Sequence, residues 1–110
     1  MFDFLSGPPA IDVHALKAAR DAGKVSLLLD VRNPDEYAQG RAPGTLNIPL
    51  GELPARLGEL AAYKGQTIHV ICRSGARSAS ACGILKQAGF DAINISGGTL
   101  AWAGSYPIER

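Results

Sequence analysis

The chain has 110 residues, of which 46% are hydrophobic and 19% charged, with 11 Lys and Arg against 10 Asp and Glu. This length suits one domain with a packed core and leaves no room for a second catalytic domain. The scattered charges and the short apolar runs favour neither a nucleic-acid partner nor a membrane.

In the first half of the chain, apolar residues recur at helical spacing after Asp12, a helix-capping residue, and stop at Gly23. The continuous apolar run from Val25 to Asp30 is typical of a strand that is buried on both faces of a parallel sheet. We expect a turn and short helical stretch over 33–37, a loop over 40–44 and a short strand over 45–48.

In the second half, the spacing of Leu53, Leu57 and Leu60 predicts an amphipathic helix over 51–62. The later elements are a strand over 67–71, a helix that ends at Gly89, a strand over 92–95, a glycine turn at 97–98, and a short helix that is capped by Thr99 and carries Trp102. Strands and helices alternate, which predicts an α/β domain with a mainly parallel sheet and helices on both faces.

The segment CRSGARS, which follows the predicted strand over 67–71, is the candidate active site. Cys72 stands at the carboxyl end of that strand, where ligands bind in open parallel sheets. The residues after it are small or basic, namely Arg73, Ser74, Gly75, Ala76, Arg77 and Ser78. Gly75 lets the backbone curl, so that successive N–H groups at the start of a helix form an anion cradle, with the charges of Arg73 and Arg77 beside it.

The anion at the centre of this cradle is predicted to be the sulfur of Cys72. A free thiol is only about a few per cent thiolate at pH 7, whereas a pKa lowered by about two units makes it mostly thiolate. The same amides would stabilise a persulfide, which allows a two-step sulfur transfer through a covalent intermediate. Such an exchange strictly requires no general base.

Four motifs in order resemble those of the rhodanese-homology family: Asp30-Val31-Arg32 with Glu36-Tyr37, the segment 40–49, CRSGARS, and Gly97-Gly98 with Ala101-Trp102. The resemblance covers about 11–107 of what we expect to be a single domain over 1–110. It implies a five-stranded parallel sheet between helices, Cys72 as persulfide carrier, and 73–77 as its cradle. It also implies a small sulfane-sulfur donor such as thiosulfate.

For the physiological donor and acceptor, the sequence allows thiosulfate and cyanide, glutathione persulfide, or a thiol of a partner protein. No metal or other cofactor is predicted, because the two His and two Cys do not form a zinc-binding pattern. The first ten residues lack the basic start and the sustained apolar stretch of a secretion signal, so we expect a cytoplasmic location.

Several other polar residues are interpreted as structural. Arg41 and Ala42 replace the His and the larger apolar residue of many relatives, and Arg41 is expected either to face solvent or to add positive potential near the site. Asp30, Arg32 and Glu36 are expected to form a structural ion-pair network. His69 is predicted to lie on the face of its strand opposite Cys72, and Cys82 to lie too far from Cys72 for a disulfide. His14 is expected on the surface and Trp102 in the core.

Two other functions are weighed against sulfur transfer. The first is a phosphatase or arsenate reductase of related fold, whose loop is one residue longer than the four residues that separate Cys72 from Arg77. One residue fewer narrows the ring by roughly 0.5 Å in radius, which suits one sulfur atom better than phosphate. The second is a non-enzymatic interaction module, which the presence of Cys72 disfavours.

Overall fold

The structure is a computed structural model that describes residues 7–110. The first ten residues, which were expected to hold no secretion signal, therefore lie mostly outside the described part. The elements are β1 (Ala10–Ile11), α1 (Val13–Asp21), β2 (Leu27–Asp30), α2 (Pro34–Gln39), β3 (Leu46–Asn47), the 3₁₀ helix η1 (Leu50–Tyr63), β4 (Thr67–Ile71), α3 (Ala76–Gln87), β5 (Asp91–Ile95) and α4 (Gly98–Ala103).

The five strands form one sheet in the order β1-β5-β4-β2-β3, and every neighbouring pair is parallel. This confirms the predicted α/β class and the five-stranded parallel sheet. The edge strand β1 was not among the elements predicted from the residues, because two residues after Pro8-Pro9 are too short to show any alternation. Ala10 of β1 pairs with Asn94 of β5, so that β1 is the edge strand next to β5.

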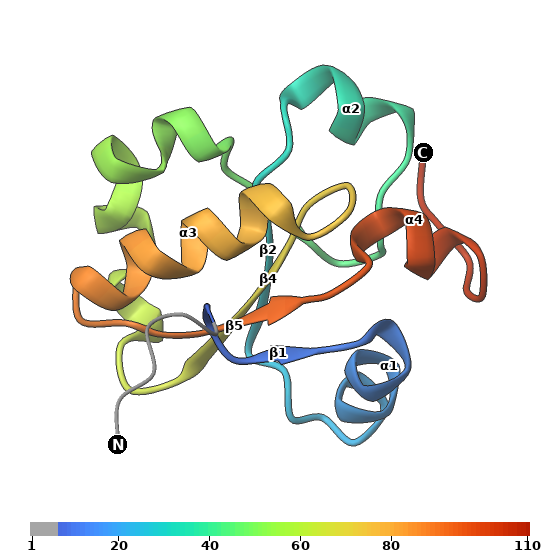
Figure 1. Ribbon diagram of the computed structural model, residues 1–110, viewed down its shortest axis with the longest axis horizontal. Coiled ribbons are helices and arrows are strands. Elements are labelled where there is room, and N and C mark those ends of the chain that lie inside the picture. The colour runs from blue at the N-terminus through green and yellow to red at the C-terminus, as the bar shows by residue number, and fades with distance from the viewer. Residues whose placement is uncertain (1–6) are drawn as a thin grey trace.

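Helices cover both faces of the sheet (Figure 1). Each face carries its own apolar cluster. One cluster joins the sheet to α3 and η1, and the other joins it to α1 and α4. Along β4, Val70 and Cys72 belong to the first cluster and Ile71 to the second, which is the alternation of a strand buried on both sides. The strand β4 is the middle of the sheet, so its carboxyl end opens between two layers of helices.

Four predicted elements differ from the structure in type or bounds. The segment that was expected to be an amphipathic helix over 51–62 is a 3₁₀ helix, in which Leu53 and Leu60 are fully buried but Leu57 is not. Its poor helix formers, Gly51, Pro54 and Gly58, weaken α-helical hydrogen bonding there. The strands β2 and β3 are shorter than predicted, and α3 begins within CRSGARS, at Ala76. Within residues 7–110, no helix is long and apolar enough to cross a membrane.

Candidate active site

The candidate nucleophile, Cys72, lies directly after the central strand β4, and its side chain is 1% exposed. The next residues turn sharply, because Gly75 adopts a φ of +114°, a conformation that residues with a side chain rarely adopt. From there the chain enters α3, twelve residues long, with Gly75 as its N-cap. The turn directs the N-terminus of α3 at the sulfur of Cys72.

Hydrogen-bond donors of the same loop surround the sulfur. The backbone N–H of Gly75 donates to Sγ of Cys72 at 3.1 Å, and the hydroxyl of Ser78 lies 3.3 Å from it. Burial raises the pKa of Cys72, but the hydroxyl of Ser78 and the backbone N–H groups of Ser78, Gly75 and Ser74 outweigh it, so that the pKa is lowered overall. The geometry therefore favours an anion at this sulfur.

The helix α4 is hydrogen-bonded to the active-site loop through its first turn. The backbone N–H and the hydroxyl of Thr99 both donate to the carbonyl of Cys72, at 2.8 and 3.1 Å, and the N–H of Leu100 donates to the carbonyl of Arg73 at 3.1 Å. The prediction of Thr99 as the cap of this helix was wrong, since the N-cap is Gly97. The hydroxyl holds the active-site loop instead of its own helix, because the carbonyl of Cys72 lies within its reach.

The second arginine of the loop, Arg77, pairs with Glu36 of α2. Its two terminal nitrogens donate to the two carboxylate oxygens at 2.6 and 2.9 Å. This bidentate pair lowers the pKa of Glu36 to about 2 and raises the pKa of Arg77. The guanidinium of Arg77 is thus held beside the loop by a carboxylate, so part of its charge is already compensated.

Acidification should expose the contribution of this ion pair to stability. Because the pKa of Glu36 is lowered in the folded state, the contribution is present above the ordinary pKa of 4.5 and is lost as the pH falls toward about 2. We expect Glu36→Gln to melt below the wild type at pH 7, and the difference to shrink between about pH 5 and pH 2. Thermal unfolding across this range, with Glu59→Gln of the exposed Arg56 pair as control, measures it. A difference that is independent of pH would contradict this account.

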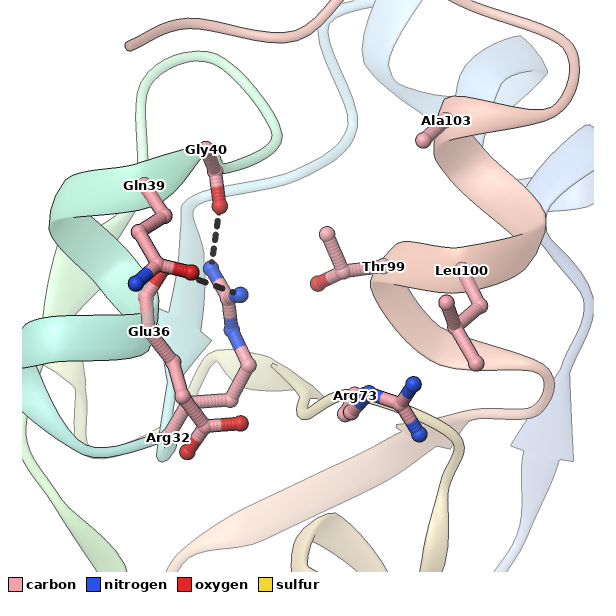
Figure 2. A pocket seen from close by; sticks show the side chains of 8 residues that line it. All are labelled: Arg32, Glu36, Gln39, Gly40, Arg73, Thr99, Leu100 and Ala103. Atoms are coloured by element: carbon pink, nitrogen blue, oxygen red, sulfur yellow. Dashed lines mark hydrogen bonds between the residues drawn. The ribbon is translucent and has the colours of Figure 1, made fainter.

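Of the network predicted for Asp30, Arg32 and Glu36, the first two form an ion pair, whereas the carboxylate of Glu36 pairs with Arg77. Asp30 and Arg32 are both buried, and their side chains meet at 2.9 Å. The remaining donors of Arg32 are directed at α2, to the carbonyls of Gly40 at 2.8 Å and of Glu36 at 3.4 Å (Figure 2). The guanidinium of Arg32 therefore joins the end of β2 to α2.

A hollow of about 210 Å³ opens between α2 and α4, beside the active-site loop. Figure 2 shows Arg73 at the base of this hollow, with Gln39 on the α2 side and Leu100 on the α4 side. Arg73 is exposed, and among the described residues no carboxylate lies within ion-pair distance of its guanidinium. The two arginines of the loop thus differ, because only Arg77 has an ion-pair partner.

One polar residue at the site was not singled out from the sequence. Asn94 of β5 is 8% exposed, and its side chain contacts both the hydroxyl of Ser78 and the carbonyl of Gly75. The available signal was a single amide in the middle of the otherwise apolar run Ala92–Ile95. Such a residue in a buried strand requires hydrogen-bond partners, and the active-site loop supplies them.

Among the described residues, the others that were predicted to be structural make no hydrogen bond to the sulfur of Cys72. His69 alternates with Cys72 along the strand and faces the other layer, and His14 is exposed, with its ring 2.6 Å from the hydroxyl of Tyr106. Cys82 is a free thiol whose pKa is raised to about 12 by burial, and Trp102 is in the core.

Arg41 is partly exposed, with 24% of its side chain accessible, and it packs against Tyr37 and the C-terminal segment. It stacks 4.8 Å from the centre of the Tyr37 ring, and its backbone pairs with that of Glu109. Its guanidinium also donates to the carbonyl of Tyr37 and lies 3.8 Å from the carboxylate of Glu109. The residue therefore ties the loop after α2 to the C-terminal segment.

Comparison with known proteins agrees with this arrangement. The family model named rhodanese-like domain matches residues 12–105. A sulfurtransferase of Allochromatium vinosum is 44% identical over 78 residues, which cover 70% of this chain and 71% of that protein. The thiosulfate sulfurtransferase PspE of Escherichia coli is 36% identical over 70 residues, which cover 64% and 67%.

Solved structures agree with the fold. The crystal structure of a rhodanese-like domain protein from Staphylococcus aureus superposes with a TM-score of 0.83 at 32% identity, covering 92% of this chain and 96% of that one. The names of the relatives support sulfur transfer as the general activity. Fold, motif order and sequence similarity agree, and the chain belongs to the rhodanese-like domain family.

Proposed function

We propose that the protein moves sulfane sulfur from a small donor such as thiosulfate to a thiophilic acceptor, cyanide or a thiol, through a persulfide on Cys72. The observation that supports this most is the position of Sγ at the N-terminus of α3, within reach of the N–H of Gly75 and the hydroxyl of Ser78. Donors that point at one sulfur atom from one loop stabilise a negative charge there.

The reaction proceeds by two displacements at sulfur. The thiolate of Cys72 attacks the outer sulfur of thiosulfate, an S–S bond forms, and sulfite leaves with the electrons of the broken bond. The acceptor then attacks the outer sulfur of the persulfide, and the thiolate of Cys72 leaves. No further oxidant or reductant is needed, because the sulfane sulfur passes from donor to acceptor without a net gain or loss of electrons by the protein.

The loop residues have distinct proposed roles. The N–H groups of Ser74, Gly75 and Ser78 and the hydroxyl of Ser78 stabilise the thiolate, as their lowering of the Cys72 pKa supports. Ala76 opens α3 with a side chain too small to obstruct the curl, Arg77 adds a charge compensated by Glu36, and Arg73 attracts the anionic donor. The acceptor is a small nucleophile or a thiol of a partner protein, in a reducing compartment such as the cytoplasm, where both free cysteines would stay reduced.

Arg73 should affect donor binding more than the chemical step. We expect Arg73→Ala to raise the KM for thiosulfate about three- to tenfold with a smaller change in kcat, because it removes an uncompensated charge beside the hollow. High salt should reduce the difference. Steady-state kinetics with Arg56→Ala, on the exposed face of η1, as a charge-matched control tests this. An unchanged KM, or an equal rise in the control, would contradict the assigned role.

The proposed function itself is tested by assaying two chemistries side by side. We expect the wild type to form thiocyanate from thiosulfate and cyanide, and to hydrolyse a small aryl phosphate negligibly. The six-residue ring from Cys72 to Arg77 encloses one sulfur atom but is too narrow to centre a phosphoryl group over it. Efficient phosphate hydrolysis without thiocyanate formation would overturn the proposal in favour of a phosphatase.

A further inference from the structure

The hydroxyl of Ser78 has two competing acceptors. Its Oγ lies 3.3 Å from Sγ of Cys72 and 2.5 Å from Oδ1 of Asn94. Ser78 is fully buried, and a serine hydroxyl carries a single hydrogen. The hydrogen can therefore serve only one of the two acceptors at a time.

The orientation of Asn94 is fixed by its second contact. Its Nδ2 donates to the carbonyl of Gly75 at 3.2 Å, and that carbonyl also accepts from the N–H of Ala79 at 3.1 Å. Turning the amide over would place Oδ1 against the carbonyl of Gly75, oxygen against oxygen. Oδ1 of Asn94 is therefore a permanent acceptor aimed at the hydroxyl of Ser78.

The charge on the sulfur decides which acceptor is preferred. A thiolate accepts a charge-assisted hydrogen bond, which is stronger than one between neutral groups. A neutral thiol, or the inner sulfur of a persulfide, is a weak acceptor, so the hydrogen is better placed on Asn94. Without Asn94, the buried hydroxyl would lack a good acceptor whenever the sulfur is uncharged, and an unmade buried hydrogen bond is costly.

We propose that Asn94 is a positioning residue that acts through Ser78. It forms one end of a hydrogen-bond switch that stabilises the uncharged forms of the Cys72 sulfur, namely the thiol and the inner sulfur of the persulfide, relative to the thiolate. The switch needs only a rotation of the hydroxyl of Ser78, so no bond is made or broken. For the persulfide the inference rests on the proposed function, whereas for the thiol it does not.

The charged groups around Cys72 lie on elements other than β5, which carries Asn94. None of them is replaced in the variants used for the test. Arg73 lies in the loop, Arg77 on α3 is paired with Glu36 of α2, and Asp30 with its partner Arg32 ends β2. On β5 and α4, the side chains nearest the loop, those of Asn94 and Thr99, are neutral. A change in the pKa on replacing Asn94 by a neutral residue therefore reports the hydrogen bond and not a change of charge.

The pH dependence of iodoacetamide alkylation tests the switch, in a Cys82→Ala background so that only Cys72 reacts. We expect Asn94→Leu to lower the pKa of Cys72 by about one unit, because the hydroxyl of Ser78 is then free for the thiolate. Ser78→Ala should raise that pKa. In the Ser78→Ala background, Asn94→Leu should leave the pKa of Cys72 unchanged. A merely structural role of Asn94 would not make its effect depend on Ser78.

Two results would overturn the switch: a pKa that stays or rises in Asn94→Leu, or a fall of equal size when Ser78 is already replaced. If Asn94→Leu does not fold, Asn94→Ala carries the same expectation without the added bulk. Alkylation requires no sulfur donor, so this test stands apart from the proposed function. If the wild type takes up no sulfur from thiosulfate but the pKa of Cys72 changes among the variants as expected, the proposed function is contradicted and the switch is supported.

Discussion

We expect Cys72→Ser to lose sulfur transfer by at least about a thousandfold while keeping its fold, because a serine oxygen cannot carry sulfur as a persulfide. The side chain is buried at the end of β4 and serine is close to it in size, so the thermal unfolding curve should remain cooperative. Thiocyanate formation from thiosulfate and cyanide measures the loss.

Cys82→Ala is the matched control for this variant. The thiol of Cys82 is buried in α3, and its raised pKa of about 12 keeps it protonated and unreactive at neutral pH. The control should therefore retain most of the activity and lose a little stability. Substantial activity in Cys72→Ser, or an equal loss in both variants, would show that the sulfur is not carried by Cys72 alone.

Gly98→Ala should be the most damaging substitution outside the loop. Gly98 adopts a φ of +57°, and an added Cβ would lie 2.5 Å from the carbonyl oxygens of both Cys72 and Arg73. Because these are backbone atoms, α4 would have to move away from the loop that it supports. We expect a loss of about 2–4 kcal/mol in the free energy of unfolding and a near-complete loss of sulfur transfer.

Gly83→Ala provides the control for this second effect. Gly83 lies on the exposed side of α3, where an added Cβ meets nothing within 4 Å. Alanine should there stabilise the helix by about 0.5–1 kcal/mol. Urea unfolding measures the stability of both variants, and thiocyanate formation measures their sulfur-transfer activity. A Gly98→Ala protein as stable and active as the wild type would contradict the support by α4.

The fold was predictable where the signal is local. The strand over 67–71 has its predicted bounds, because a β-branched run is followed directly by the polar active-site loop. Asp12 caps α1 as expected, accepting from the N–H of Ala15. The helix over 51–62 was predictable from its leucine spacing, but its 3₁₀ type was not, because that spacing reports which side is buried and not which hydrogen-bond pattern the backbone adopts.

The candidate site was predictable as a segment but not as a network. Gly75 and its turn follow from the loop sequence alone. The partners of the loop lie far away along the chain: Glu36 is 41 residues from Arg77, and Asn94 is 16 residues from Ser78. No local pattern encodes such pairs, because the packing of α2 and β5 around the end of β4 brings them together.

Intact mass of the wild type after incubation with thiosulfate, followed by peptide mapping, tests the central claim most directly. We predict the gain of one sulfur atom on the peptide that contains Cys72, and its removal by cyanide with release of thiocyanate. Unchanged mass, or sulfur found on Cys82, would contradict the proposal that Cys72 carries the transferred sulfur.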